Sequence, residues 1–161
     1  MAEHLEIAPG GKEKKYSVLF RQIEMLAQSE DDPIALLANA ASMIHVTFDF
    51  FWTGFYLVKN DTLVLGPFQG PLACSRIRFG KGVCGTAWER AETIVVPDVD
   101  KFPGHIACSS ESRSEIVSPM FRNGNVMGLL DIDSKSLAQF DNIDARWIQK
   151  ICSLLSSKIF Q

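Results

Sequence analysis

The sequence predicts a mixed α/β fold of the α+β kind, in which a central antiparallel β-sheet has its helices packed on one face. Two stretches with helical periodicity open the chain, strands joined mostly by hairpins follow, and an amphipathic helix closes it. Strands grouped in this way favour an antiparallel sheet. With 161 residues, 47% of them hydrophobic, the chain is the size of one domain. We expect a single domain over residues 1–161, with a flexible N-terminal tail at residues 1–12.

Four helices are expected. Apolar side chains recur at helical spacing in residues 13–28, which predicts the first helix. The second covers residues 33–45, with Asp32 as its N-cap and proline at its first position. A short helix is expected at residues 82–92. The last helix follows the N-cap residue Asp141 and has a broad apolar stripe.

The strands are predicted from aromatic and β-branched runs that end at turn residues. They are expected at residues 51–58, 62–65, near 77, 93–96, 115–121 and 126–133. Asn60-Asp61 is the predicted turn of the first hairpin, and residues 66–78 are expected to be mainly loop. The strand at 93–96 is expected to be buried. Residues 97–114 form a long irregular loop, and such loops are often functional.

The second hairpin determines whether three acids meet. Asp131 and Asp133 lie two positions apart on one strand, so their side chains project from the same side. If residues 123–125 form the loop, Glu115 lies opposite Asp133, and Val117 lies opposite Asp131, on that same face. A two-residue loop would put Glu115 on the other face. We expect the three-residue loop, which also pairs Pro119 with Leu129 and Phe121 with Met127.

Three acids on one face would form a binding site for a cation such as an ammonium group. Because neighbouring like charges oppose ionisation, at least one acid should have a raised pKa and donate a proton at neutral pH. The alternative is that Asp131 and Asp133 are solvated acids at a strand end. Leu129, Leu130 and Ile132 argue against it, because they mark this strand as largely buried.

Aromatic residues indicate a second wall of the same site. Trp52, Gly54 and Tyr56 alternate onto one side of their strand, and the glycine leaves a notch between two large rings. A small ligand could lie there, since aromatic rings suit a thioether, a sulfoxide methyl or an ammonium group. The alternative is that these rings are ordinary core residues.

Three of the four cysteines are candidates for redox chemistry. Cys108 lies in the long loop, where a thiol can reach a substrate, and His105 or a backbone amide could stabilise its thiolate. Cys84 lies near the predicted start of a helix, whose dipole would favour the thiolate. Cys74 lies in a flexible run, which suits a thiol that must travel to an oxidised partner. Cys152, on the closing helix, is expected to be buried and inert.

Other classes of function lack support. A net charge of −3 leaves no basic surplus for nucleic acid, and no glycine-rich nucleotide motif is present. The sequence has no apolar run long enough for a signal peptide or a membrane span, so we expect a cytoplasmic protein without membrane contact. Cys74, Cys84, Cys108 and His105 could bind zinc in an interaction module. Because close Cys-x-x-Cys pairs are missing, we expect no metal.

Several sequence runs, which cover most of the chain from Trp52 onward, resemble the free methionine-(R)-sulfoxide reductases, a family of GAF-domain proteins. They are residues 68–71, 73–74, 79–87, 96–99, 102–108, 114–117 and 128–134. The resemblance implies a GAF-like fold and the thiol-dependent reduction of free L-methionine-(R)-S-oxide to L-methionine. It implies no cofactor beyond the external reductant thioredoxin, and a homodimer as the assembly.

The resemblance also assigns roles to the candidate residues. Cys108 would attack the sulfoxide sulfur and become a sulfenic acid, which Cys74 would resolve as an intramolecular disulfide, with Cys84 as an auxiliary thiol. The acids match the family's substrate-binding and proton-donating positions, and the aromatic pair matches its pocket wall. These matching residues are Glu115, Asp131 and Asp133, and Trp52 and Tyr56.

Two positions depart from the family pattern, and several assignments stay open. Ser109 stands where the family often has an acidic residue, and Cys152 has no assigned counterpart. Either Cys74 or Cys84 could be the dominant resolving thiol, and any of the acids could donate the proton. The main rival is a non-catalytic GAF sensor for a small molecule, which would not need two thiols able to meet.

Overall fold

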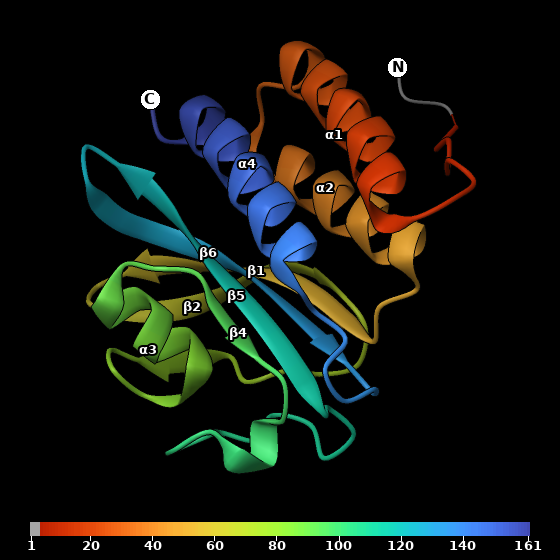
Figure 1. Ribbon diagram of the computed structural model, residues 1–161. Coiled ribbons are helices and arrows are strands. Elements are labelled where there is room, and N and C mark those ends of the chain that lie inside the picture. The colour runs from red at the N-terminus through yellow and green to blue at the C-terminus, as the bar shows by residue number, and fades with distance from the viewer. Residues whose placement is uncertain (1–3) are drawn as a thin grey trace.

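Six strands form one antiparallel sheet in the computed structural model, which describes residues 4–161 (Figure 1). The strands are β1 Trp52–Lys59, β2 Thr62–Gln69, β3 Arg76–Arg78, β4 Ile94–Val96, β5 Ser114–Arg122 and β6 Asn125–Ser134. Their order across the sheet is β3-β2-β1-β6-β5-β4. The two hairpins therefore lie side by side, with β1 paired to β6 at the centre.

Three long helices cover one face of this sheet (Figure 1). They are α1 Lys12–Ser29, α2 Pro33–Phe48 and α4 Asn142–Ile159. The predicted antiparallel sheet with helices on one face is confirmed. The short helix α3 Gly82–Arg90 lies against the opposite face, together with the loops that precede and follow it. A single 3-10 turn, Val99–Lys101, interrupts the long loop before β5.

The predicted helix starts are confirmed by their capping contacts. Asp32 accepts hydrogen bonds from the backbone N–H groups of Ile34 and Ala35, and Asp141 forms a capping box with Asp144. α2 extends to Phe48, past the predicted end near residue 45, and stops where the next residue adopts a left-handed conformation. These contacts fix the ends of the helical layer on the sheet.

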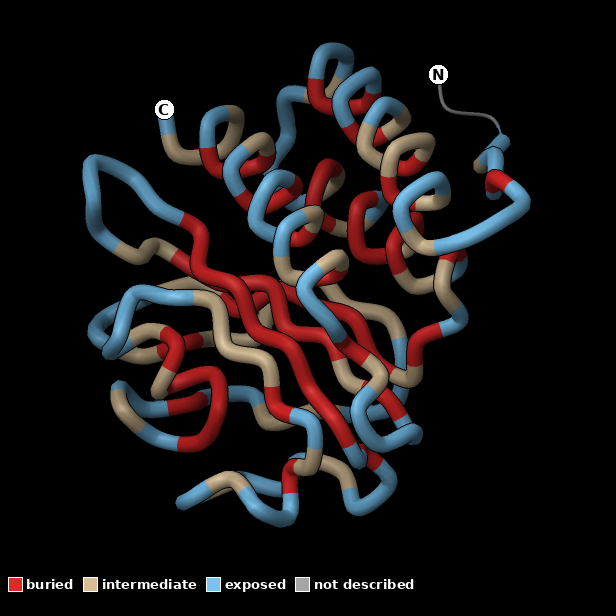
Figure 2. Tube along the Cα trace, in the orientation of Figure 1, coloured by how far each residue is buried: buried red, intermediate tan, exposed pale blue. Residues whose placement is uncertain are grey.

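The sheet separates two apolar cores. One lies beneath the three long helices and includes Phe55, Ile116 and Leu130, whereas the other lies beneath α3 and includes Val117 and Leu129. Figure 2 shows the consequence, because the central strands are buried along much of their length and the outer faces of the helices are exposed. Alternate residues of one strand therefore enter different cores.

Two strand predictions were wrong in detail. Residues 66–69, expected to be loop, continue β2, because β1 is long enough to pair Gly54 with Phe68 after a local register shift. Residues 94–95 of β4 are only half-buried, although the strand was predicted to be buried. The reason is its place at the sheet edge, where β5 is its single neighbour.

The second hairpin reaches the predicted register by a different route. Its turn contains two residues, since Arg122 pairs with Asn125, so the predicted three-residue loop was wrong. A β-bulge then places Met120 opposite Gly128 and leaves Met127 unpaired, so the predicted Phe121–Met127 pair was also wrong. The extra residue restores the predicted alignment beyond the bulge. The restored pairs are Glu115–Asp133, Val117–Asp131 and Pro119–Leu129.

The N-terminal segment lies against the helical layer. Within the predicted tail, Ala8 is buried, and the backbone N–H of Glu6 donates a hydrogen bond to Gln22 of α1. Residues 1–3 of that tail lie outside the described residues. Among residues 4–161, no helix is both long and apolar enough to cross a membrane.

Candidate active site

The floor of the candidate site is a patch of three neighbouring strands on the α3 side of the sheet. Residues directly opposite each other on antiparallel strands project from the same face. The cross-strand rows on β1, β6 and β5 are Trp52–Asp133–Glu115, Gly54–Asp131–Val117 and Tyr56–Leu129–Pro119. The two hairpins thus bring the aromatic pair and all three acids onto one surface.

One cavity above this floor is lined by every residue predicted for the site except Cys74. Its lining includes Trp52, Tyr56, Ala73, Cys84, His105, Cys108, Glu115, Asp131 and Asp133. α3 supplies Cys84, and the long loop before β5 supplies His105 and Cys108. Cys74, one residue beyond the lining residue Ala73, reaches the cavity through its bond to Cys108. The residues come from distant parts of the sequence, and the sheet register brings them together.

The three acids form a cluster in which Glu115 and Asp131 are buried and Asp133 is half-buried. Glu115 and Asp131 are each 6% exposed. Within the described residues, neither Lys nor Arg forms a salt bridge with any of the three, and Asp131 Oδ1 has no hydrogen-bond partner. Burial, reinforced by Asp131, raises the pKa of Glu115 and of Asp133 well above the ordinary range. Burial also raises the pKa of Asp131 to about 6. The cluster therefore holds protons near neutral pH.

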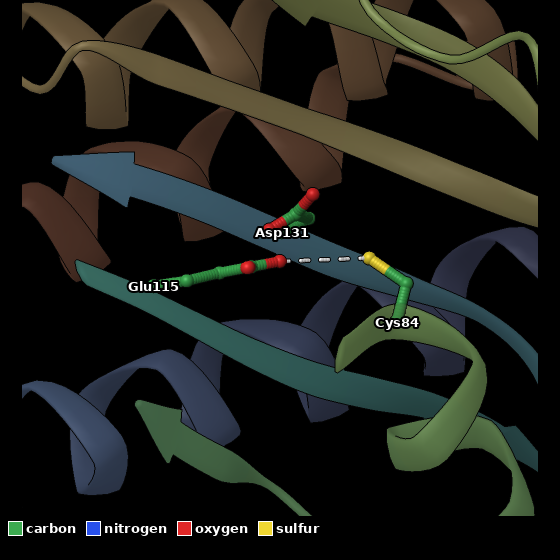
Figure 3. A group of neighbouring side chains, drawn as sticks. All are labelled: Cys84, Glu115 and Asp131. Atoms are coloured by element: carbon green, nitrogen blue, oxygen red, sulfur yellow. Dashed lines mark hydrogen bonds between the residues drawn. The ribbon is translucent and has the colours of Figure 1, made fainter. Parts of the chain in front are cut away.

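Cys84 belongs to this cluster. Its Sγ lies 3.9 Å from Glu115 Oε1, and Asp131 lies beside the pair (Figure 3). Burial, followed by the charges of Asp131 and Glu115, raises the pKa of the Cys84 thiol. The prediction that the helix start would favour its thiolate is therefore wrong, because desolvation and two carboxylates outweigh the dipole of a short helix.

His105 lies on the other side of Glu115. The distance from His105 Nε2 to Glu115 Oε2 is 3.9 Å. Burial lowers the pKa of His105, so the ring is neutral at pH 7 and adds no positive charge to the acids. The protons that the raised pKa values retain on the acids therefore limit the negative charge of the cluster.

Cys74 and Cys108 are joined by a disulfide, with their Cα atoms 5.4 Å apart. Cys108 is exposed at the mouth of the cavity, whereas Cys84 and Cys152 are free and buried. The pairing consumes two of the four ligands considered for a zinc-binding module, so that set cannot bind zinc in this form. The structure thus places a reversible redox pair beside the acidic cluster.

The aromatic wall positions the segment that contains Cys74. Trp52 Nε1 donates a hydrogen bond to the Pro71 carbonyl over 3.1 Å, and the Tyr56 hydroxyl donates one to the Cys74 carbonyl over 2.8 Å. The predicted ligand notch at Gly54 was wrong. The Trp52 ring occupies that space, so a Cβ on Gly54 would clash with it. The glycine lets the indole lie flat against the strand.

The sequence analysis missed one buried residue of the site and assigned another correctly. Ser112 is 9% exposed and lines the cavity, but its position in a serine-rich loop gave no signal. Cys152 lies in the core beneath the long helices, and its Sγ donates to the Ser118 carbonyl. Its predicted burial is confirmed, and the sheet separates it from the cavity.

Comparison with known proteins shows which class of domain the chain contains. Residues 32–159 match the model of the GAF domain, so this is a GAF-domain protein. The chain is 55% identical to GAF domain-containing protein A of Dictyostelium discoideum, over 98% of this chain and all of that protein. It is also 41% identical to the free methionine-R-sulfoxide reductase of Saccharomyces cerevisiae, over 96% of this chain and 92% of the relative.

A solved structure identifies the family within the GAF-domain proteins. The free methionine-R-sulfoxide reductase of Neisseria meningitidis, in complex with its substrate, superposes with a TM-score of 0.96 at 49% identity. The match covers 98% of this chain and 95% of that one. The chain therefore belongs to the free methionine-R-sulfoxide reductase family.

Proposed function

We propose that this protein reduces free L-methionine-(R)-S-oxide to L-methionine by a thiol cycle. The observation that carries the proposal is the Cys74–Cys108 disulfide, which lies at the mouth of a cavity floored by three acids. A redox pair and a cation-binding floor in one cavity fit an oxidised amino acid. The relatives named for this activity support the assignment.

The acidic floor explains a preference for the free amino acid. A free α-ammonium group supplies the positive charge that Glu115, Asp131 and Asp133 lack, and a methionine sulfoxide within a peptide has no such group. Trp52 and Tyr56 form the apolar wall for the methyl sulfoxide end of the substrate. The two walls together orient the sulfoxide toward Cys108.

The first half-reaction reduces the sulfoxide and oxidises Cys108. The Cys108 thiolate attacks the sulfoxide sulfur while a carboxylic acid of the cluster protonates the sulfoxide oxygen. The attack forms a bond between the two sulfurs, the substrate S–O bond breaks, and the doubly protonated oxygen leaves as water. Water then attacks the Cys108 sulfur and gives up one proton, the bond between the sulfurs breaks, and methionine leaves with Cys108 as a sulfenic acid. The raised pKa of these acids keeps the required protons available near neutral pH.

The second half-reaction forms the disulfide that the structure contains. The Cys74 sulfur attacks the Cys108 sulfur, and the hydroxyl leaves as water with the proton of the Cys74 thiol. The two thiols thus supply the two electrons that reduce the sulfoxide sulfur. A non-catalytic sensor has no need for this pairing, which argues against that alternative.

We also propose that thioredoxin reduces the disulfide and that the protein is a homodimer in the cytoplasm. The exposure of Cys108 supports attack by a protein dithiol. Exposed apolar side chains on α1 and α2 support a contact between copies. They are Met25, Ile34 and Val46, 67%, 68% and 53% exposed. Light scattering of purified protein tests the dimer, and fractionation of cells tests the compartment.

An assay with separate sulfoxide epimers tests the proposed activity. Wild-type protein, supplied with thioredoxin and its recycling system, should reduce the free R epimer and leave the S epimer and peptide-bound sulfoxide unchanged. Cys108→Ser should lose all turnover, because serine cannot form a sulfenic acid. Normal rates in this variant would overturn the assignment of the nucleophile.

The resolving thiol needs a second variant. Cys74→Ser should still release methionine in a first turnover but should not be recycled by thioredoxin, because the disulfide cannot form. An unchanged steady-state rate would instead give the resolving role to Cys84.

A further inference from the structure

Three buried side chains on the cavity floor have the composition of a transition-metal site. Cys84 Sγ, one carboxylate oxygen of Glu115 and one of Asp131 lie within 4.8 Å of one another. α3 supplies the thiol, and the neighbouring strands β5 and β6 supply the two carboxylates (Figure 3). None of the three belongs to the disulfide.

Asp131 gives an independent indication that a cation belongs here. Its side chain is buried, and Oδ1 has no hydrogen-bond partner among the described residues. An unpartnered buried polar atom destabilises the fold, so such atoms need an explanation. A cation coordinated beside Cys84 and Glu115 would supply the missing partner.

We propose that Cys84, Glu115 and Asp131 bind a divalent cation of the zinc class, and that the bound ion blocks the cavity against the substrate ammonium group. The blocking effect rests on the proposed function. The binding of the ion itself does not, since it depends only on the ligands that the structure brings together.

The ligand types select zinc over harder cations. Magnesium and calcium prefer six or more oxygen ligands, whereas a thiolate with two carboxylates suits Zn²⁺. Typical Zn–S and Zn–O distances of about 2.3 and 2.0–2.2 Å place tetrahedral ligands roughly 3.5 Å apart. Cys84 Sγ and Glu115 Oε1 are 3.9 Å apart, and all three ligand atoms lie within 4.8 Å of one another, so the side chains must move closer together when the ion binds. Water would occupy the fourth position.

The proposed site uses no atom of the disulfide. Binding releases the protons of Cys84 and of the Glu115 carboxyl group to solvent and transfers no electron, so no oxidant or reductant is required. Because the disulfide joins only Cys74 and Cys108, the three proposed ligands stay available in the oxidised protein, which should therefore bind zinc. Only Cys84 and Cys152 remain as free thiols in this form.

Cobalt substitution tests the site in the oxidised protein without substrate. One Co²⁺ per chain should give the near-ultraviolet thiolate-to-cobalt absorption band, and Zn²⁺ should displace it. Cys84→Ser should lose the band and bind Zn²⁺ at least about 100-fold more weakly, since the loss of even an outer partner can cost that much. Cys152→Ser is the matched control, because it removes the other free thiol, and should keep both properties.

A second variant distinguishes the loss of a metal ligand from the loss of the fold. Asp131→Asn keeps the thiol and the shape of the side chain, and should bind Zn²⁺ at least about tenfold more weakly while its circular dichroism stays unchanged. No thiolate band in wild-type protein, or an undiminished band in Cys84→Ser, would overturn the site.

Competition separates this proposal from the proposed function. Free methionine-(R)-sulfoxide should weaken Zn²⁺ binding to the oxidised protein, because both occupy the acidic floor. If ion and sulfoxide bind together without mutual effect, the blocking role is wrong. If the protein binds one Zn²⁺ through Cys84 but never reduces the sulfoxide, the metal site stands and the proposed function fails.

Discussion

Two buried aspartates on opposite sides of the sheet have different surroundings. Asp144, on the helical side, is fully buried, but its Oδ1 accepts from the Tyr16 hydroxyl over 2.7 Å, and its Oδ2 accepts from Lys12 and a backbone N–H. Asp131, on the cavity side, has one oxygen, Oδ1, without a hydrogen-bond partner among residues 4–161, and the acids Glu115 and Asp133 are nearby.

The difference in hydrogen-bond and ion-pair partners indicates different roles: Asp144 stabilises the fold, whereas Asp131 belongs to the candidate binding site. Asp144 joins α1 to α4, and the fold already contains its cation and its hydrogen-bond donors. Asp131 has the same side chain and similar burial, but no Lys or Arg among residues 4–161 forms a salt bridge with it. Because an uncompensated buried acid weakens a fold, its presence in a cavity indicates binding or catalysis.

The largest effect should follow from removing the acid between Cys84 and His105. Glu115→Gln keeps the size of the side chain but cannot donate the same proton, so kcat/KM for free methionine-(R)-sulfoxide should fall about 10²–10⁴-fold. Steady-state kinetics with thioredoxin measure it. A loss below about threefold would show that the cluster is not part of the chemistry.

The opposite pattern is expected on the helical side. Asp144→Ala leaves Lys12 and Tyr16 without their shared partner and removes part of the α4 cap, so the free energy of unfolding should fall by roughly 2–4 kcal/mol. Urea unfolding measures this loss, and the folded fraction should keep normal kcat/KM. A fall in kcat/KM without a loss of stability would contradict the structural role of Asp144.

Asp131→Asn should make the protein more stable above about pH 6. The pKa of Asp131 rises from 3.8 in the unfolded chain to about 6 in the fold. The folded state therefore holds the extra proton, and wild-type stability falls as pH rises through this interval. Since one pKa unit corresponds to about 1.36 kcal/mol, the gain at pH 7–8 should approach roughly 2–3 kcal/mol.

The gain from Asp131→Asn should shrink toward zero below about pH 3, where the folded and the unfolded states both hold the proton. Thermal unfolding across pH measures it. A variant less stable than wild type at pH 8 would mean that the acid already has its partner within the fold.

The smallest effect is expected for Cys152→Ser. This thiol lies in the core beneath the long helices, and burial raises its pKa to about 12, so it is inert at neutral pH. The variant should keep kcat/KM within about twofold and lose roughly 1 kcal/mol or less of stability, since serine can still donate to the Ser118 carbonyl. A large kinetic defect would place a fourth thiol in the cycle.

Strand periodicity was enough to predict the acidic face, although the turn was misread. Alternation put Asp131 and Asp133 on one side, and Glu115 joins them because the bulge at Met127 offsets the shorter turn. The predicted loop was one residue too long and the bulge of one residue was not predicted, so the two errors cancelled in the register. The sequence has no local signal for such a bulge, so the correct register did not follow from the loop length that predicted it.

Features that depend on contacts between distant elements could not be predicted. The protonated state of Cys84 follows from the packing of α3 on β5 and β6, which no local pattern encodes. The same holds for the Trp52 ring over Gly54, since the choice between ligand notch and packed indole depends on a rotamer. Residue types predicted the chemistry, whereas tertiary packing set its electrostatics.

A single-turnover experiment tests the central claim, that Cys108 and the acidic floor act on one substrate in one cavity. Reduced Cys74→Ser protein is mixed with one equivalent of free methionine-(R)-sulfoxide and a dione that traps sulfenic acids, and peptides are analysed by mass spectrometry. We expect one methionine released per chain and the adduct on Cys108. An adduct on Cys84 with Cys108 unmodified, or no release of methionine, would contradict the account.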